Sequence, residues 1–247
     1  MNRDTNQAKT NMNNIQIFTF NPVQENTYVI SDETNECVII DPGCYFPEEK
    51  KEIFEYIQQN NLTPIHLLNT HCHTDHVLGN AFIHESFNLA PKIHENEVEV
   101  LHHAKTMGAS FGLFMDESPE PDVCLIEGNK INFGNSTLEI ILTPGHSPGS
   151  VCFYNRKEGY IIGGDVLFRT SIGRTDLPGG DLDTLLNSIS KKLFTLEDDI
   201  IVYSGHGPYT TIGYEKKHNP FLTFQLIAYK PKYQCQIQRE PLLAYFA

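Results

Sequence analysis

The stretch that decides the fold is Thr70-His71-Cys72-His73-Thr74-Asp75-His76, which places three imidazoles and a carboxylate in one short segment. An apolar run with strand character, Ile65–Leu68, comes before it, and a segment with helical periodicity, Val77–Phe87, comes after it. The motif therefore lies on a loop that leads from a strand into a helix.

The spacing inside this motif indicates metal chemistry. His71 and His73 are two residues apart, so in an extended backbone their side chains leave on the same side and can share one ion. Asp75 and His76 open the following helix and turn toward a neighbouring position. Cys72 should point away from both histidines, and we do not expect it to be a ligand. One loop can thus supply ligands to two adjacent metal ions.

The donor types narrow the choice of metal. Neutral imidazole and carboxylate are the ligands that zinc uses, and iron and manganese bind to similar sites. We therefore expect two divalent metal ions as cofactors, with zinc as the first choice and iron or manganese as the alternatives.

Length and composition predict one large α/β domain rather than two small ones. The chain has 247 residues, of which 40% are hydrophobic and 20% are charged, and no apolar run is long enough to span a bilayer. Residues 1–14 are rich in Asn and Thr and have no apolar core, so we expect a disordered tail and neither a secretory signal nor an anchor.

The charge and the cysteines restrict the partners and the compartment. A net charge of −13 argues against nucleic acid or an anionic membrane, because both need a basic face. The six cysteines are scattered without a C-x-x-C pair, which predicts reduced thiols in the cytoplasm. We expect a small-molecule substrate and a monomer or small homo-oligomer.

The rest of the chain alternates between strand-like and helix-like segments, as a layered α/β fold requires. Strands are predicted at 15–19, 27–31, 37–40, 90–93, 130–133, 136–142, 151–154 and 160–162, and helices at 47–60 and 95–105. Asp41 follows the third strand and is either a turn residue or a partner that orients a ligand histidine. The irregular segment after Gly108 is either a lid over the site or, through its apolar tip at 111–115, packed on the body.

Three further ligand candidates follow predicted strands, and each lies next to a glycine that lets the backbone turn sharply. They are His146 in Pro-Gly-His-Ser-Pro-Gly, Asp165 in Gly-Gly-Asp and His206 in Ser-Gly-His-Gly. Each of them alone would more often be a turn residue. Together with the first loop they form a set of nitrogen and oxygen donors.

This set of motifs resembles the metallo-β-lactamase superfamily over nearly the whole chain. The segments 164–168, 172–176, 205–208 and 218–221 are similar to the small bacterial glyoxalase II-like, or hydroxyacylglutathione hydrolase-like, enzymes. The resemblance implies an αββα four-layer sandwich, in which two mixed β-sheets lie face to face with helices on the outer faces. It would place a hydrolase domain at 15–221 and a C-terminal extension, packed on that domain, at 222–247.

Carried over position by position, the resemblance assigns a role to each candidate. One metal would be held by His71, His73 and His146, and the other by Asp75, His76 and His206, with Asp165 bridging both. Asp75 and Asp165 would also be the catalytic residues. No motif position is substituted.

The expected metal-bound hydroxide and the lack of a general acid in these motifs predict a thioesterase. A metal-bound hydroxide would attack a carbonyl carbon, and a thiolate, with a pKa of about 8.5, then leaves without protonation, whereas an amine would need a general acid that these motifs lack. The resemblance points to S-lactoylglutathione or a related thioester. Only residues 221–247 follow the last motif, so we do not expect the helical C-terminal domain that supplies glutathione contacts in larger glyoxalase II enzymes. Arg169 and Arg174 are the nearest cations, and Arg174 beside Asp176 is either an anion anchor or a structural ion pair.

Other functions stay open at this stage. The runner-up is a mononuclear iron persulfide dioxygenase acting on glutathione persulfide, whose metal would use His71, His146 and Asp165. A β-lactamase is disfavoured by the missing general acid and by the absence of an export signal. A binding protein with an idle site is disfavoured by the complete set of ligands.

Overall fold

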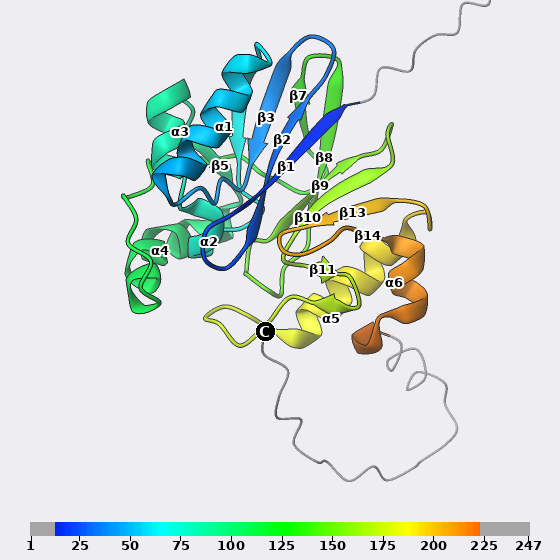
Figure 1. Ribbon diagram of the computed structural model, residues 1–247. Helices are drawn as coiled ribbons and strands as arrows, with labels where there is room; N and C mark the ends of the chain where they lie inside the picture. Colours follow the sequence, from blue (N-terminus) through cyan, green and yellow to red (C-terminus); the bar gives the residue numbers. More distant parts are fainter. Residues whose placement is uncertain (1–12, 223–247) are drawn as a thin grey trace, which may run out of the picture.

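The structure is a computed structural model that describes residues 13–222. Two six-stranded sheets and a separate two-stranded sheet make up its β-structure, and helices cover the outer faces of the two larger sheets (Figure 1). The four-layer αββα arrangement expected from the motifs is therefore confirmed.

The first sheet has the strand order β1-β2-β3-β4-β5-β6. Pairing is antiparallel from β1 to β3 and parallel from β3 to β6, so the sheet is mixed. Its strands are β1 (Asn14–Phe20), β2 (Glu25–Ser31), β3 (Glu36–Ile40), β4 (Thr63–Leu68), β5 (Pro91–Ile93) and β6 (Asp122–Val123).

The second sheet has the order β14-β13-β10-β9-β8-β7, and only its β10–β13 pair is parallel. Its strands are β7 (Lys130–Phe133), β8 (Ser136–Leu142), β9 (Val151–Asn155), β10 (Tyr160–Gly164), β13 (Ile201–Ser204) and β14 (Thr210–Thr211). The small hairpin consists of β11 (Leu167–Phe168) and β12 (Ser171–Ile172).

Helices flank each sheet (Figure 1). On the side of the first sheet are α1 (Pro47–Gln59), α2 (Thr74–Val77), α3 (Asn80–Phe87), the 3₁₀ turn η1 (Glu95–Glu97) and α4 (Val98–Ser110). On the side of the second are α5 (Leu182–Lys191), the 3₁₀ turn η2 (Leu193–Thr195) and α6 (Ile212–His218).

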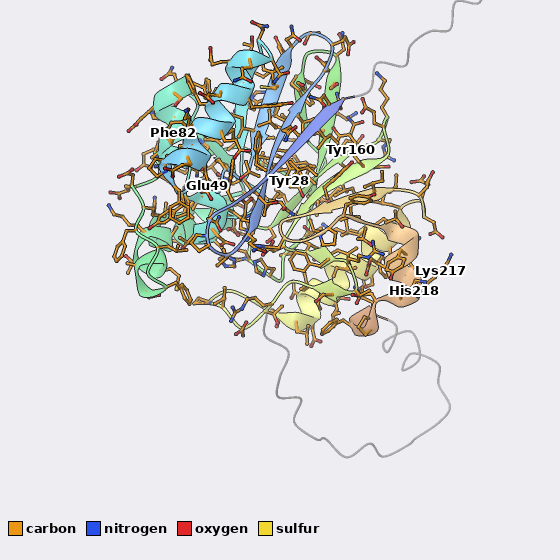
Figure 2. The ribbon with its side chains drawn as sticks, in the orientation of Figure 1. Tyr28, Glu49, Phe82, Tyr160, Lys217 and His218 are labelled. Carbon is orange, nitrogen blue, oxygen red and sulfur yellow. The ribbon has the colours of Figure 1, made fainter. Side chains whose placement is uncertain are left out.

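Successive side chains along a strand point to opposite faces of the sheet, so one strand contributes to two separate cores. In β3, Ile39 packs with Ile53 of α1 in the core beneath the helices, whereas its neighbour Ile40 packs in the core between the sheets. Tyr28 and Tyr160, labelled in Figure 2, belong to the inter-sheet core as well. Both faces of the central strands are thus buried, which explains their continuous apolar sequences.

Two predicted helices differ from the structure. The expected helix Val77–Phe87 is interrupted, because Gly79 donates its N–H to the carbonyl of Pro42 at 2.7 Å and leaves no room for a side chain against Cys44. The chain therefore forms α2 and then α3. The helix expected at 95–105 begins as the 3₁₀ turn η1 and continues as α4 through Ser110.

The described residues cover only part of the terminal segments that the sequence analysis predicted. β1 begins at Asn14, and Asn13 donates a hydrogen bond to Ser136 at 2.7 Å. The remainder of the expected tail at 1–14 and nearly all of the expected extension at 222–247 lie outside the described residues, so these boundaries stay predictions. Among residues 13–222, no helix is long and apolar enough to cross a membrane.

Candidate metal centre

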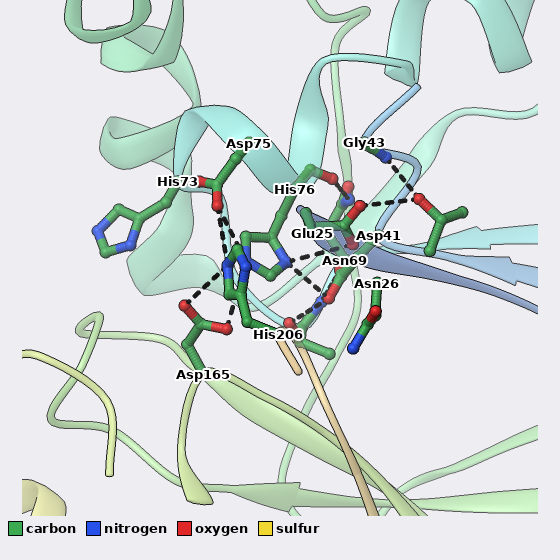
Figure 3. Close-up of polar contacts among 12 residues, drawn as sticks. Glu25, Asn26, Asp41, Gly43, Asn69, His73, Asp75, His76, Asp165 and His206 are labelled. Carbon is green, nitrogen blue, oxygen red and sulfur yellow. Dashed lines mark hydrogen bonds and ion pairs between the residues drawn. The ribbon is translucent and has the colours of Figure 1, made fainter. Parts of the chain in front are cut away.

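The seven candidate residues come from four segments of the chain that lie close together. Figure 3 labels His73, Asp75, His76, Asp165 and His206 among them. The loop after β4 carries His71 and His73, and α2 carries Asp75 and His76. His146, Asp165 and His206 follow β8, β10 and β13 respectively. Because β10 and β13 are parallel, their carboxyl ends meet at the same edge and bring Asp165 and His206 together.

The first donor set consists of His71, His73 and His146, whose ring nitrogens lie within 4.8 Å of one another. Nε2 of His146 is 3.2 Å from Nε2 of His71 and 2.8 Å from Nδ1 of His73. Two nitrogens bound at about 2.0–2.1 Å to a tetrahedral ion lie roughly 3.3 Å apart. The three imidazoles are thus arranged as a cation such as zinc requires.

The second donor set consists of Asp75, His76 and His206. Oδ2 of Asp75 is 3.1 Å from Nε2 of His206 and 3.5 Å from Nε2 of His76. His76 is fully buried, whereas His206 and Asp75 are partly exposed toward the cleft. This set combines two imidazoles with one carboxylate.

Asp165 lies between the two sets. Its Oδ1 is 3.4 Å from Nε2 of His76, and its Oδ2 is 3.6 Å from Nε2 of His146 and 3.6 Å from Nε2 of His206. One carboxylate therefore faces both donor sets, with its two oxygens directed to different histidines.

In four of the five imidazole rings, the outward nitrogen lies against an acceptor outside the cluster. Nδ1 of His146 donates to the carbonyl of Arg174 at 2.7 Å, and Nδ1 of His206 lies 3.2 Å from the carbonyls of Val23 and Gln24. A ring that donates through Nδ1 presents the lone pair of Nε2 to the cluster. Both rings are therefore oriented as metal ligands.

Asp41 fixes the remaining two rings. Its Oδ2 accepts from Nδ1 of His76 at 3.1 Å and from the hydroxyl of Thr70 at 2.6 Å, and that hydroxyl lies 3.1 Å from Nδ1 of His71. Of the two roles considered for Asp41, the structure shows the second, a partner that orients ligand-type histidines. Asp41, His71 and His76 also form a compact triplet, but hydrogen bonds account for its contacts.

The two donor sets differ in the direction in which the pKa values of their histidines are shifted. Burial and the neighbouring imidazoles lower the pKa of His71 well below its ordinary value, and burial lowers the pKa of His146 and brings that of His73 to about 4. These three rings are neutral at pH 7, which is the form that binds a metal.

Carboxylates dominate the second set. Burial opposes the charged form of His76 and His206, but Asp75 and Asp165 outweigh it and raise the pKa of both rings. Conversely, although burial alone would raise the pKa of Asp75 and Asp165, the nearby His76 holds both below the ordinary value. In this set the carboxylates thus favour the charged form of the imidazoles, and His76 in turn favours the ionised form of both carboxylates.

Two features around His76 and Asp165 fit a bound cation. Nε2 of His76 and Oδ1 of Asp165 are buried and have no hydrogen-bond partner among the described residues, so each has a donor orbital left for a cation. Gly205 keeps the space open, because a Cβ there would collide with Oδ1 of Asp165 and with the ring of His76.

Cys72 lies outside the cluster, as expected. Its side chain is fully buried in an apolar group with Val77, Ile93, Leu101 and Ala104. The alternation of side chains along the loop thus separates the two histidines from the cysteine between them.

Sequence reasoning missed three buried polar residues that hold the loops of the centre. Glu25 is fully buried, with Oε1 3.8 Å from Nδ1 of His76. Asn26 donates from its side chain to the carbonyls of Ser204 at 3.0 Å and Gly207 at 2.8 Å, and so clamps the loop of His206. A Glu-Asn pair at the start of an otherwise apolar strand was the only available signal, since both residues are depleted in strands.

Glu97 is the third missed residue, and it joins the two loops of the first donor set. Its Oε2 accepts from the backbone N–H of Cys72 at 2.8 Å, and its Oε1 accepts from the hydroxyl of Ser147 at 2.5 Å and from the N–H of Gly149 at 2.7 Å. The carboxylate thereby sets the distance between the loop of His71 and His73 and the loop of His146.

A cleft of about 620 Å³ opens onto the donor cluster. Five of the seven donors line it, namely His73, Asp75, His146, Asp165 and His206, and its apolar lining includes Val23, Phe111, Leu113, Phe168 and Ile172. Of the apolar tip considered as a lid, Leu113 and Met115 pack on the body, whereas Phe111 lines the cleft and stays 65% exposed. Part of the tip therefore packs on the body, as one of the two alternatives predicts, and a lid role stays a prediction.

Comparisons with known proteins agree with this arrangement. A model of the metallo-β-lactamase superfamily matches residues 20–206. The chain is 42% identical over 203 residues to the probable metallo-hydrolase YqgX of Bacillus subtilis (strain 168), with 81% of this chain and 93% of that one covered. It is 37% identical over 211 residues to the hydroxyacylglutathione hydrolase GloC of Haemophilus influenzae, with 85% and 98% covered.

Solved structures give a similar result. The BLEG-1 B3 metallo-β-lactamase is 38% identical with a TM-score of 0.78, and covers 85% of this chain and 100% of its own. TTHA1623, solved in a di-iron-bound form, is 37% identical with a TM-score of 0.76, and covers 84% of this chain and 100% of its own. The family match spans all seven donors.

Proposed function

The chain belongs to the metallo-β-lactamase superfamily, as its motifs predicted, and we propose that it is a dinuclear metallohydrolase that cleaves an acyl thioester such as S-lactoylglutathione. One observation carries this proposal: two sets of three donors lie on either side of Asp165, which faces both. A mononuclear site built from His71, His146 and Asp165 would leave the other four candidates without a ligand role, namely His73, Asp75, His76 and His206.

The proposed ligands are His71, His73 and His146 for one ion and Asp75, His76 and His206 for the other, with Asp165 shared. We expect zinc, and iron is the first alternative because the similar TTHA1623 was solved with two irons. Divalent cations held there would supply a water of lowered pKa, near 7, and would polarise a carbonyl oxygen.

Hydrolysis adds one water across the acyl C–S bond. The water oxygen bonds to the acyl carbon, the C–S bond breaks, and the sulfur leaves with its electron pair as a thiolate. Asp75 and Asp165 have pKa values held below the ordinary range, so both are ionised at neutral pH and can accept the proton that the water loses. That proton then passes to solvent or to the thiolate.

The cleft favours a thiolate as the leaving group. Among the described residues that line it, the titratable side chains are the donors themselves and Arg174, whose guanidinium stays charged and cannot act as an acid at neutral pH. An amine would need a proton donor to depart, whereas a thiolate, with a pKa of about 8.5, does not. A thioester therefore suits this site better than an amide or a β-lactam.

Parallel assays test this proposal. The metal-loaded protein should hydrolyse S-lactoylglutathione at a rate that falls after chelation and returns with added metal, and it should consume no oxygen when given glutathione persulfide. Oxygen consumption without thioester hydrolysis would instead establish the persulfide dioxygenase alternative. Faster turnover of a β-lactam than of any thioester would also reject the proposal.

A further inference from the structure

A second cavity, of about 380 Å³, lies beside the catalytic cleft. The two hollows share His73, Thr74, Met107 and Leu177 in their walls. His73 is a proposed metal ligand, so the second cavity borders the donor cluster itself. Its volume is within the range of about 300–1,000 Å³ that ligand sites usually have.

One face of α4 forms a wall of this cavity, which we name the α4 cavity. Val100, Ala104 and Met107 recur at the helical spacing of three to four residues. Pro148, Leu177 and Pro178 contribute further apolar surface. The lining is therefore apolar at the point where a substrate would leave the donor cluster.

The charges around the cavity exclude an anionic occupant. Glu99, an exposed residue, is the only Asp, Glu, Lys or Arg among the described residues that line it. A carboxylate that entered would meet the like charge of Glu99 and neither a Lys nor an Arg among the described residues. Glutathione carries two carboxylates at neutral pH, so its peptide part does not suit this hollow.

The main cleft has no unengaged cation for glutathione either, as far as the described residues show. Arg174 is its only Lys or Arg, and Nε and Nη2 of that side chain each donate to Asp176 over 2.7 Å. The Nε–Nη2 edge of the guanidinium, which suits a carboxylate in two parallel bonds, is thus directed at Asp176. Of the two roles considered for Arg174, the structure shows the ion pair.

We infer that the α4 cavity is the acyl subsite, and that the preferred substrates are thioesters of uncharged, apolar acyl chains longer than lactoyl. This inference rests on the proposed thioesterase function. With the carbonyl at the donor cluster, an alkyl chain runs past His73 into the space between α4 and Leu177. We assign the acyl group of the thioester, and not its thiol part, to the apolar α4 cavity, because common carrier thiols bear polar amides or carboxylates. The thiol half then lies in the main cleft.

A chain-length series tests the subsite. Acetyl, butanoyl, hexanoyl and octanoyl thioesters of one neutral thiol, N-acetylcysteamine, are compared with S-lactoylglutathione on the metal-loaded full chain. We expect kcat/KM to rise by about fourfold for each added methylene until the cavity is filled. The hexanoyl thioester should be a better substrate than S-lactoylglutathione.

Two variants fill the cavity, and one matched variant does not. Val100→Trp and His103→Trp place an indole in the α4 cavity, the first from its wall and the second from its exposed edge. Each should lower the ratio of octanoyl to acetyl kcat/KM at least about tenfold. Every methylene of the acyl chain that the indole excludes from the cavity loses its burial, and these losses add up in the octanoyl substrate. Thr106→Trp, on an exposed position of α4 that lines neither cavity, should leave that ratio unchanged.

Binding gives a readout that does not depend on turnover. The affinity of the corresponding non-hydrolysable octyl thioether, measured by calorimetry, should fall in Val100→Trp and His103→Trp and stay constant in Thr106→Trp. Two failures are distinguishable. Hydrolysis of S-lactoylglutathione with no chain-length dependence and no effect of either cavity-filling variant would overturn the acyl subsite alone. Absence of hydrolysis for every thioester would overturn the proposed function and the subsite with it.

Discussion

Nδ1 of His76 donates a hydrogen bond to Oδ2 of Asp41 over 3.1 Å, and both side chains are almost fully buried. The bond fixes the ring so that Nε2 faces Asp75 and Asp165. Asp41 also accepts two bonds from Thr70, so one carboxylate positions residues on both sides of the proposed metal pair.

Asp41→Asn should weaken metal binding. Both oxygens of Asp41 accept hydrogen bonds, so the amide nitrogen of asparagine must face either Thr70 or His76 as a second donor. We expect metal affinity to fall about 10–100-fold, as is usual when a ligand histidine loses its outer partner. Competition with a chelator measures it. Asp122→Asn, a surface residue paired with Lys92, is the control and should bind metal as the unchanged protein does.

Asp165→Ala should abolish hydrolysis. The change removes the oxygens that face His76, His146 and His206, so both donor sets lose a partner. We expect a loss of activity larger than the ~10–100-fold typical of an outer partner, together with a lower metal content. Elemental analysis and thioester turnover check both effects. A variant with unchanged turnover would refute a shared role for Asp165.

Glu97→Gln should destabilise the protein and loosen the first donor set. Three donors converge on the carboxylate, and an amide nitrogen would oppose at least one of them inside a buried site. We expect the free energy of unfolding to fall by about 1–3 kcal/mol, measured in urea without metal. Glu99→Gln, two residues away and exposed, should leave the unfolding free energy unchanged. An equal loss in both variants would argue against the bridging role.

Asp32 should make the fold sensitive to acid. It accepts bonds from Thr34, Asn135 and Ser136 and so ties the β2–β3 turn to the β7–β8 turn. Although burial opposes the charge, these bonds, first those from Thr34, lower its pKa. The stabilisation is therefore complete above the unfolded value of about 3.9 and is lost as the pH falls through the lower folded pKa.

The test compares Asp32→Asn with the unchanged protein, both free of metal. Urea midpoints should differ at pH 7 and converge as the pH falls below about 4, because the unchanged protein then loses the charged form that the variant never has. A constant difference down to the lowest pH would show that the charge of Asp32 does not contribute.

Local patterns in the sequence predicted the longer strands up to β10, but not β6 or the short strands after β10, and the resemblance of the motifs named the seven residues that the structure brings together. The alternation of His71, Cys72 and His73 placed two rings on one side and the thiol on the other, which the structure confirms. Asp41 could only be narrowed to two roles, because its partner His76 is distant in sequence.

Contacts between distant segments could not be predicted in the same way. Asn26 holds the loop of His206 from 181 residues away at Gly207, and Glu97 reaches Ser147 across 50 residues. The break between α2 and α3 likewise depends on the contact of Gly79 with Pro42. No helical or strand period encodes such pairs, since they form only when the layers pack.

The most direct measurement is the number and identity of the metal ions on the purified protein, made on the same sample as S-lactoylglutathione and hexanoyl thioester turnover. Our account predicts about two divalent ions per chain and thioester hydrolysis that is lost with chelation. A single iron per chain, with oxygen consumed on glutathione persulfide and no thioester cleaved, would contradict it.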